Sequence, residues 1–176
     1  MTAPLVRLAE PRDAAQLGVI GPAAYAEAYT QLWDDPAAYA RHLETFGLGA
    51  FERLLAQPSA RVWVAETGGR VVGFLQLMLN CADPLDGAEG GVALKRIYIL
   101  GPARGLGLGK RLLAAALADA HARGAAYIWL DVMASSKVVM KTYRAWGFAK
   151  AGCVAFEGGT REGFRDMVVM RRGISA

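Results

Sequence analysis

Side chains that build disulfide frameworks and metal sites are scarce in this sequence, which has two cysteines and two histidines among 176 residues. Cys81 and Cys153 lie far apart and lack the spacing of zinc ligands, and His42 and His121 are isolated. We expect Cys153 to be a small buried hydrophobe and both histidines to lie at the surface. The pattern predicts no metal site and is typical of a reduced, cytoplasmic protein.

Long apolar runs are also missing, since the stretch Val71 to Leu79 is only long enough for a strand. The start of the chain carries four charged residues, Arg7, Glu10, Arg12 and Asp13. We therefore expect neither a signal peptide nor a membrane-spanning segment, and no membrane partner. The net charge of +4 is small and its basic residues are scattered, so no nucleic-acid-binding surface is predicted.

The most informative feature is a glycine-rich segment that follows an apolar strand. Leu94 to Leu100 contains β-branched residues and stops at Gly101-Pro102, which predicts a buried strand. Three glycines, Gly105, Gly107 and Gly109, then lead into a helix rich in Leu and Ala. Backbone N–H groups at a helix N-terminus lack partners and lie at the positive end of the dipole, so such a turn binds phosphate oxygens. A plain strand-to-helix turn without a ligand is the alternative.

The spacing of these glycines excludes two common nucleotide-binding motifs. A P-loop would need glycine at Arg104 and a serine or threonine at Arg111. A dinucleotide fingerprint that starts at Gly105 would need its third glycine at Lys110. The segment therefore predicts a phosphate ligand of another kind.

At this length we expect one domain, residues 1–176, with a sizeable core. Asp13 and Gln16 form a candidate capping box for the first helix, while Gly18, Gly21 and Pro22 weaken its first turns. The helix therefore has two candidate starts, Asp13 and Pro22. The expected elements of the first half are a strand over 5–9, this helix ending at 29 or 32, a helical stretch from 36 to about 56 interrupted near Gly47 and Gly49, and strands 61–66 and 71–80 joined by a Gly68-Gly69 turn.

The second half of the chain predicts a βαβ unit followed by a helix and two strands. The expected bounds are a loop over 81–91, strand 92–100, helix 107–123 capped by Gly124, strand 127–132, a helix from Ser135 or Ser136 to Trp146, and strands 149–156 and 164–171 around a loop at 157–163. Because βαβ crossovers join parallel strands, strands 92–100 and 127–132 should be parallel neighbours.

A second motif carries the resemblance to a known family. Ser136-x-x-Val139-x-x-x-Tyr143-x-x-x-Gly147-Phe148 places Ser136, Val139 or Met140, and Tyr143 on one helical face. The pattern is similar to Asn-x-x-Ala-x-x-x-Tyr-x-x-x-Gly-Phe of the GNAT family of N-acetyltransferases, and Arg104-x-x-Gly107-x-Gly109 resembles that family's pyrophosphate loop. The two motifs occur in the family's order and separation, and the predicted elements match its fold along nearly the whole chain.

This resemblance implies an α/β (α+β) fold. Its mixed, mostly antiparallel central sheet has six to seven strands, is split between the fourth and fifth strands and is flanked by about four helices. It also implies acetyl-CoA as cosubstrate and a primary amine of a small molecule as acceptor. The segments Arg96-Ile97-Tyr98-Ile99 and Ile128-Trp129-Leu130 are together similar to the spermidine/spermine acetyltransferase branch. Membership of that branch would make the acceptor a polyamine.

The resemblance further implies roles for individual residues. The backbone of Ile97, Tyr98 and Ile99 would pair with the pantetheine arm, and an N–H near Ile99 would polarise the thioester carbonyl. Tyr143 would contact the cofactor and protonate the leaving thiolate, and its alternative role is packing on an amphipathic helix. The remaining cofactor-binding residues would be Arg104, Gly105, Leu106, Gly107, Leu108, Gly109, Lys110 and Ser136.

Two departures from the family pattern bear on function. Ser136 stands where the family usually has asparagine, and a hydroxyl reaches less far than an amide. Relatives of the polyamine branch often carry a glutamate near the Arg-Ile-Tyr stretch, whereas Ala93-Leu94-Lys95 offers no carboxylate. The second departure puts polyamine specificity in doubt.

The acceptor pocket is expected between the first two helices and the final hairpin loop. Candidate wall residues are Tyr29, Trp33 and Asp34, with Tyr25, Asp35, Glu157 and Glu162 as further contributors. The general base is left unassigned among Glu27, Asp34, Asp35 and water. Transfer to protein or peptide amino termini and a non-catalytic CoA-binding regulatory module are the alternative functions, and a monomer and a homodimer both remain open.

Overall fold

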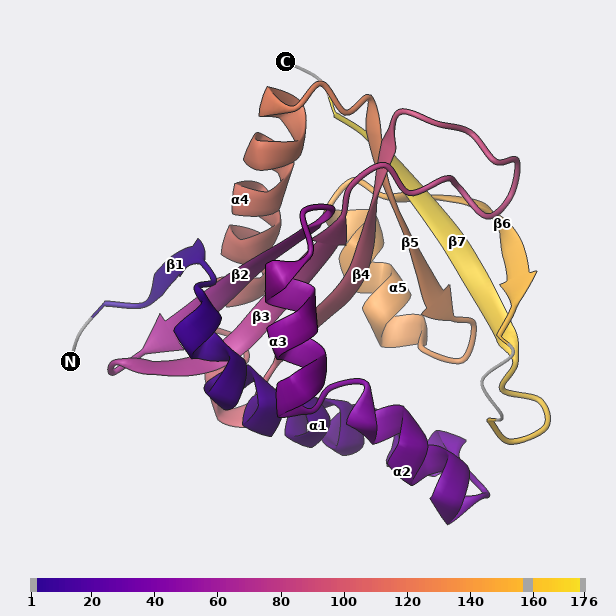
Figure 1. Ribbon diagram of the computed structural model, residues 1–176. Helices are drawn as coiled ribbons and strands as arrows, with labels where there is room; N and C mark the ends of the chain where they lie inside the picture. Colours follow the sequence, from indigo (N-terminus) through magenta and orange to yellow (C-terminus); the bar gives the residue numbers. More distant parts are fainter. Residues whose placement is uncertain (1–2, 157–159, 175–176) are drawn as a thin grey trace.

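Seven strands form one sheet in the order β1-β2-β3-β4-β5-β7-β6 (Figure 1). The computed structural model describes residues 3–156 and 160–174. Its strands are β1 (Leu5–Leu8), β2 (Ala60–Thr67), β3 (Arg70–Met78), β4 (Gly91–Ile99), β5 (Tyr127–Met133), β6 (Ala149–Ala155) and β7 (Asp166–Gly173). Its α-helices are α1 (Ala14–Tyr29), α2 (Pro36–Glu44), α3 (Leu48–Ala56), α4 (Leu108–Ala122) and α5 (Lys137–Ala145). Short 3-10 turns are η1 (Pro11–Asp13), η2 (Thr30–Leu32) and η3 (Gly101–Ala103).

The pairing of the strands confirms the expected mixed, mostly antiparallel sheet. β4 and β5 are parallel neighbours, as predicted, and the other strand pairs are antiparallel. The parallel pairing covers only Gly91–Ala93 of β4 and 127–129 of β5. Beyond these residues the two strands diverge, so the sheet is split at its centre.

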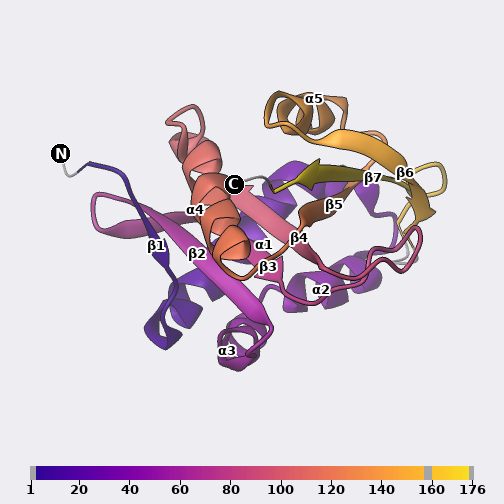
Figure 2. The same ribbon diagram turned by 90° about the horizontal axis from the view of Figure 1, so that it is seen from above.

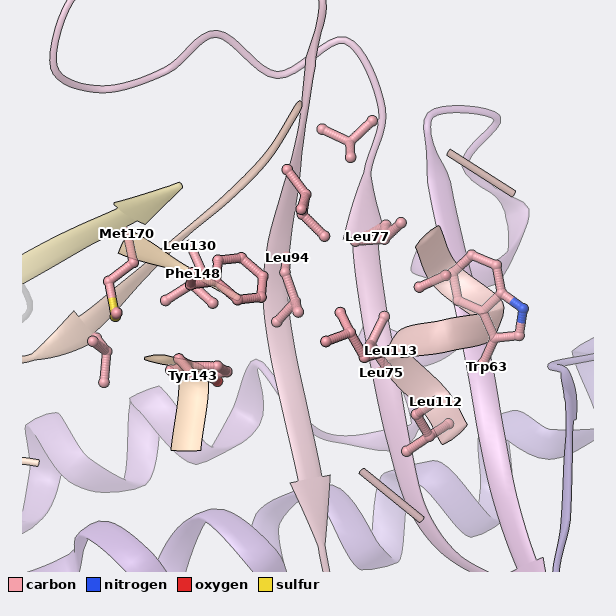
Figure 3. Packing of buried hydrophobic residues seen from close by; sticks show 14 of the residues in the cluster. Trp63, Leu75, Leu77, Leu94, Leu112, Leu113, Leu130, Tyr143, Phe148 and Met170 are labelled. Carbon is pink, nitrogen blue, oxygen red and sulfur yellow. The ribbon is translucent and has the colours of Figure 1, made fainter. Parts of the chain in front are cut away.

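Helices cover both faces of the sheet and bury a core on each (Figures 1 and 2). The α4–α5 core contains Leu75, Leu112 and Leu130 among its buried residues (Figure 3). The α1–α3 core contains Phe51 and Phe74, whose rings meet edge to face. None of the helices in residues 3–156 and 160–174 is long and apolar enough to cross a bilayer.

A bulge in β4 decides which of its side chains face which core. Lys95 is the extra residue, because Arg96 pairs with Gln76 while Leu94 pairs with Leu77. Leu94 and Ile97 therefore both pack on the α4–α5 core although they are three residues apart. Arg96 and Tyr98 face the opposite side, where Tyr98 joins the α1–α3 core.

The predicted second start of the first helix, at Pro22, is wrong. α1 begins at Ala14 and runs through Pro22, because its glycines allow close packing on α3. A Cβ on Gly18 would lie 2.6 Å from the backbone nitrogen of Leu48, and one on Gly21 would lie 3.0 Å from the Phe51 ring. The glycines that weaken the helix locally are therefore required by its tertiary contact.

The predicted capping box of Asp13 and Gln16 is also wrong. The Asp13 carboxylate accepts from the Glu10 backbone N–H at 2.7 Å and from Arg7 at 2.7 and 2.8 Å. Gln16 instead accepts from the Val71 backbone N–H at 3.1 Å, which ties α1 to β3. Both side chains thus bond to neighbours outside the helix.

Other differences concern burial and helix length. The helical stretch predicted over 36–56 is two helices, separated at residues 45–47, which fits the expected interruption near Gly47. Cys153 is exposed rather than buried, because β6 is an edge strand with one open side. His42 is half-buried rather than at the surface, whereas His121 is exposed as expected.

Candidate functional site

A cavity of about 540 Å³ opens where β4 and β5 diverge. One wall is β4 from Leu94 to Ile99, and the facing wall includes Asp131, Val132 and Met133 of β5. α1 and α2 close it on one side of the sheet, and Tyr143 of α5 and Trp146, which follows α5, also line it. Because β4 and β5 no longer pair here, this edge of β4 presents backbone groups to the cavity instead of to a strand.

The glycine-rich loop meets the cavity at the start of α4. Gly105 and Gly107 have φ angles of +80° and +72°, and a Cβ on either would meet nothing within 4 Å. Among the described residues, no group accepts a hydrogen bond from the backbone N–H groups of residues 105–110. The loop therefore offers a row of free donors in open space at the N-terminus of a 15-residue helix.

Gly109 has a different role from the other two glycines. It lies within α4, and a Cβ there would be 2.9 Å from the Trp146 ring. This close approach brings the first turn of α4 against α5, and both Gly109 and Trp146 line the cavity. The loop and the cavity are thus parts of one continuous site.

Arg104 is held by its neighbours at the start of this loop. Its Nε donates to the Ile99 carbonyl at 3.0 Å, and its Nη1 lies 3.2 Å from a carboxylate oxygen of Glu27. The other Glu27 oxygen accepts from the Gly101 backbone N–H at 3.2 Å. Glu27 therefore anchors both ends of η3 to α1, and it does not line the cavity.

Ser136 occupies the N-cap position of α5, as one of the two predicted caps, but its side chain makes no capping hydrogen bond. It lies near Tyr29 of α1, which lines the cavity. Burial raises the pKa of Tyr29, and the nearby Ser136 hydroxyl and the charge of Arg104 act in the opposite direction. Ser136 thus lies beside the cavity next to a polar lining residue.

Tyr143 points from α5 into the same space. Its ring packs against Trp146 and Phe148, with centroids 5.8 and 5.7 Å apart, and it belongs to the α4–α5 core (Figure 3). Among the described residues, none forms a hydrogen bond with its hydroxyl, which leaves this group available to a molecule in the cavity. Burial raises the pKa of Tyr143, with smaller contributions from Tyr29 and Asp131, so the phenol stays protonated at neutral pH.

The side of the cavity under α1 and α2 is rich in aromatic rings. The rings that line it belong to Tyr25, Tyr29, His42, Phe46, Tyr98 and Phe156. Burial raises the pKa of Tyr25 to about 12, opposed by a hydrogen bond from Trp33. Burial, together with the nearby charge of Arg96, lowers the pKa of His42, so its imidazole is neutral at pH 7.

Of the three predicted acceptor residues, only Tyr29 lines the cavity. Trp33 lies behind the lining and donates its indole N–H to the Tyr25 hydroxyl at 3.2 Å. Asp34 is exposed and pairs with Arg161 at 2.8 Å. Among the further contributors, Asp35 caps α2 and Glu162 is exposed, while Glu157 lies outside the described residues.

Sequence reasoning missed Arg96, Asp131 and His42, all of which line the cavity. A signal was present for Asp131, because it is the single charged residue in the apolar run of β5. Arg96 gave no separate signal, since the face it occupies depends on the bulge at Lys95. His42 contacts Tyr25 and Trp33, and this contact depends on how α2 lies over α1.

Comparison with known proteins places this arrangement in context. Residues 24–148, which contain the glycine-rich loop and Tyr143, match the model of the Acetyltransferase (GNAT) family. An uncharacterized N-acetyltransferase of Mycobacterium bovis is 27% identical over 141 residues, which cover 77% of this chain and 85% of that protein.

Solved structures share the fold along almost the whole chain. The PaiA N-acetyltransferase of Thermoplasma acidophilum, solved in complex with coenzyme A, has a TM-score of 0.79 at 15% identity and covers 98% of this chain and 99% of its own. The ribosomal-protein-alanine N-acetyltransferase of Brucella melitensis has a TM-score of 0.75 at 24% identity, with 96% and 99% covered. At these identities the likeness concerns the fold.

Proposed function

Because this chain belongs to the GNAT family of acetyltransferases, we propose that it transfers the acetyl group of acetyl-CoA to a primary amine of a small molecule. The observation that carries the proposal is the continuity of the glycine-rich loop with the cavity between β4 and β5. A loop of free N–H donors suits a diphosphate, and an unpaired strand edge suits an extended amide chain.

The residues present fit this cosubstrate. Residues 104–110 would hold the diphosphate, since a Cβ on Gly105 or Gly107 would occupy the open space beside the N–H donors. The backbone of Ile97–Ile99 would orient the pantetheine arm along the open edge of β4, and Ser136 would offer one further hydrogen bond. Bound acetyl-CoA supplies the acetyl group as a reactive thioester.

Tyr143 is proposed as the proton donor of the reaction. Its pKa is raised by burial, so the phenol holds its proton at working pH, and its hydroxyl has no described protein partner. A protonated phenol in the cavity can protonate a leaving thiolate. Burial of the sulfur would raise the pKa of the thiol, which favours protonation of the thiolate. An N–H near Ile99 would stabilise the negative charge on the carbonyl oxygen.

The finer identity of the acceptor is a separate question. The segment Arg96-Ile97-Tyr98-Ile99 resembles the polyamine branch of the family and so supports a polyamine acceptor. Against this, Asp131 is the single carboxylate among the described lining residues, whereas a polyamine carries several positive charges. The Brucella melitensis neighbour is named for a ribosomal-protein alanine, which keeps amino termini as an alternative acceptor. A CoA-binding module without catalysis is opposed by the intact Tyr143 and glycine-rich loop.

Cys81 and Cys153 are unpaired, which supports a cytoplasmic location.

The test is a steady-state assay of CoA release with a panel of polyamines, amino acids and short peptides. Acetyl-CoA affinity should be measured beside it by calorimetry, so that binding and transfer are separated. Turnover with small amines supports the proposal, and turnover with peptides alone would move the function to amino termini. Tight binding without turnover on any acceptor would favour the regulatory module.

A further inference from the structure

An unpaired guanidinium lies in the wall of the cavity on the α1–α2 side. Arg96 of β4 donates to the backbone carbonyl of Thr45 at 2.9 Å and to its hydroxyl at 3.0 Å, and its Cζ lies 3.9 Å from the centroid of the Phe46 ring. These contacts hold the side chain on the cavity side of α2 and use two of its five N–H donors.

No carboxylate of the described residues lies within 4.0 Å of Arg96, in contrast to Arg104, which pairs with Glu27. Burial lowers the pKa of Arg96, but an arginine starts so far above neutrality that it remains charged. A half-buried cation without a counter-ion is costly unless a ligand supplies the anion. Arginine is also well suited to bind a carboxylate, because its planar fork can donate two parallel hydrogen bonds.

The opposite wall of the cavity carries a single negative charge. Asp131 of β5 lies on the same face of the sheet as Met133, which belongs to the α1–α3 core, so it faces the side on which Arg96 lies. Within the part of the chain that the structure describes, no ion pair or hydrogen bond involves its carboxylate. The rings of Tyr25, Phe46 and Tyr98 line the same cavity.

We infer that the acceptor is an amine that also carries a carboxylate, an amino acid or related aminocarboxylate with an apolar side chain, whose carboxylate binds Arg96. This inference rests on the proposed acetyl transfer and specifies its substrate class. The acceptor's amino group lies on the Asp131 side, and its apolar part contacts the aromatic rings. A polyamine would bring a second cation toward Arg96 and Lys95, which is unfavourable.

The test compares acceptors that differ in the carboxylate alone. Phenylalanine, phenylalanine amide and phenethylamine share one ring, and spermidine represents the polyamines. For the native enzyme, kcat/KM with phenylalanine should exceed that with the amide and with phenethylamine by about 10- to 100-fold, the value of hydrogen bonds to a charged group. The amide controls for amine basicity, since it lacks the carboxylate but has the more easily deprotonated amine.

Arg96→Gln should lower the ratio of kcat/KM for phenylalanine to kcat/KM for the amide by about 10- to 100-fold. For Arg96→Lys, kcat/KM with phenylalanine should lie between the values for the native enzyme and for Arg96→Gln. Lysine keeps the positive charge but lacks the planar guanidinium fork. Arg41→Gln is the matched control, because it removes the same charge from the exposed side of α2, outside the cavity lining. Its ratio of kcat/KM for phenylalanine to that for the amide should equal the ratio of the native enzyme.

A binding measurement without acetyl-CoA provides a second readout. N-acetylphenylalanine should raise the melting temperature of the native enzyme more than N-acetylphenylalanine amide does, and Arg96→Lys should narrow the difference. Equal or absent binding of the two compounds, or an acceptor ratio near one in the native enzyme, would overturn the inference. Either result would leave the proposed acetyl transfer unaffected. Failure of the native enzyme to bind acetyl-CoA would instead show that the proposed function is wrong.

Discussion

Tyr143 combines a buried ring with a hydroxyl that no described residue binds. Tyr143→Phe keeps the contacts with Trp146 and Phe148, so the melting temperature and the acetyl-CoA affinity should change little. Loss of a general acid should lower kcat by about 10²- to 10⁴-fold. Steady-state kinetics with the best acceptor, together with calorimetry, would measure both effects.

Tyr127→Phe is the control for this change. The Tyr127 hydroxyl donates to the Ala88 carbonyl at 2.9 Å, outside the cavity, so its removal should leave kcat unchanged. Normal turnover by Tyr143→Phe would show that Tyr143 is a packing residue. A joint loss of stability and activity would assign its hydroxyl a structural role instead.

Asp13 is a buried carboxylate whose charge contributes to stability. Its side chain is 3% exposed and pairs with Arg7, and this hydrogen bond is the largest cause of its lowered pKa. A lowered carboxyl pKa stabilises the folded state above the unfolded pKa, about 3.9, and this contribution disappears as pH falls through the folded value. The network therefore supports the fold at neutral pH and fails in acid.

Asp13→Asn should lower the free energy of unfolding at pH 7 by about 1 to 3 kcal/mol, because the Arg7 guanidinium and the Glu10 backbone N–H lose a charged acceptor. The difference from the native protein should narrow as the pH falls below about 4. Urea unfolding at several pH values would show this, with Glu52→Gln on the exposed surface of α3 as the control. A difference that does not vary with pH would contradict the assignment to charge.

Among the elements, the turn from β4 into α4 is the proposed diphosphate-binding site. Gly107→Ala would place a methyl group in the open space beside the free N–H donors and should weaken acetyl-CoA binding about 10-fold or more. Calorimetry measures the affinity directly. The change also strains the backbone, since Gly107 has a φ of +72°.

Gly124→Ala separates that strain from the effect on binding. Gly124 follows the other end of α4 with a φ of +78°, and a Cβ there also meets nothing within 4 Å. Both variants should therefore lose similar stability, and only Gly107→Ala should lose affinity. Equal acetyl-CoA affinity in the two folded variants would remove the loop from the proposed binding site.

The elements also show how far local sequence patterns reach. The Gly68-Gly69 hairpin, the cap at Gly124 and the parallel β4–β5 pair were predictable, because turn chemistry and βαβ connections act over short stretches. The start of α1 was not, because Gly18 and Gly21 are set by contacts with α3. Propensity gave way there to tertiary packing.

For the whole molecule, the split sheet and the glycine-rich turn into α4 could be predicted, while the cavity wall that contains Arg96 could not. The resemblance to the family is carried by the two motifs around Gly107 and Tyr143, which lie at the start of α4 and within α5, the next helix along the chain. In the cavity wall on the α1–α2 side, Arg96 bonds to Thr45, which is 51 residues away. The face that Arg96 occupies depends on a β-bulge that the sequence does not reveal. Side chains that meet only through such contacts have no local signature.

The proposed acetyl transfer to an amine at the cavity between β4 and β5 can be followed by mass spectrometry of the reaction with the best acceptor, combined with quantification of free CoA. We expect an acceptor that gains one acetyl group on its amine, formed one for one with CoA. Release of CoA without an acetylated acceptor, or no release with any amine despite bound acetyl-CoA, would contradict it.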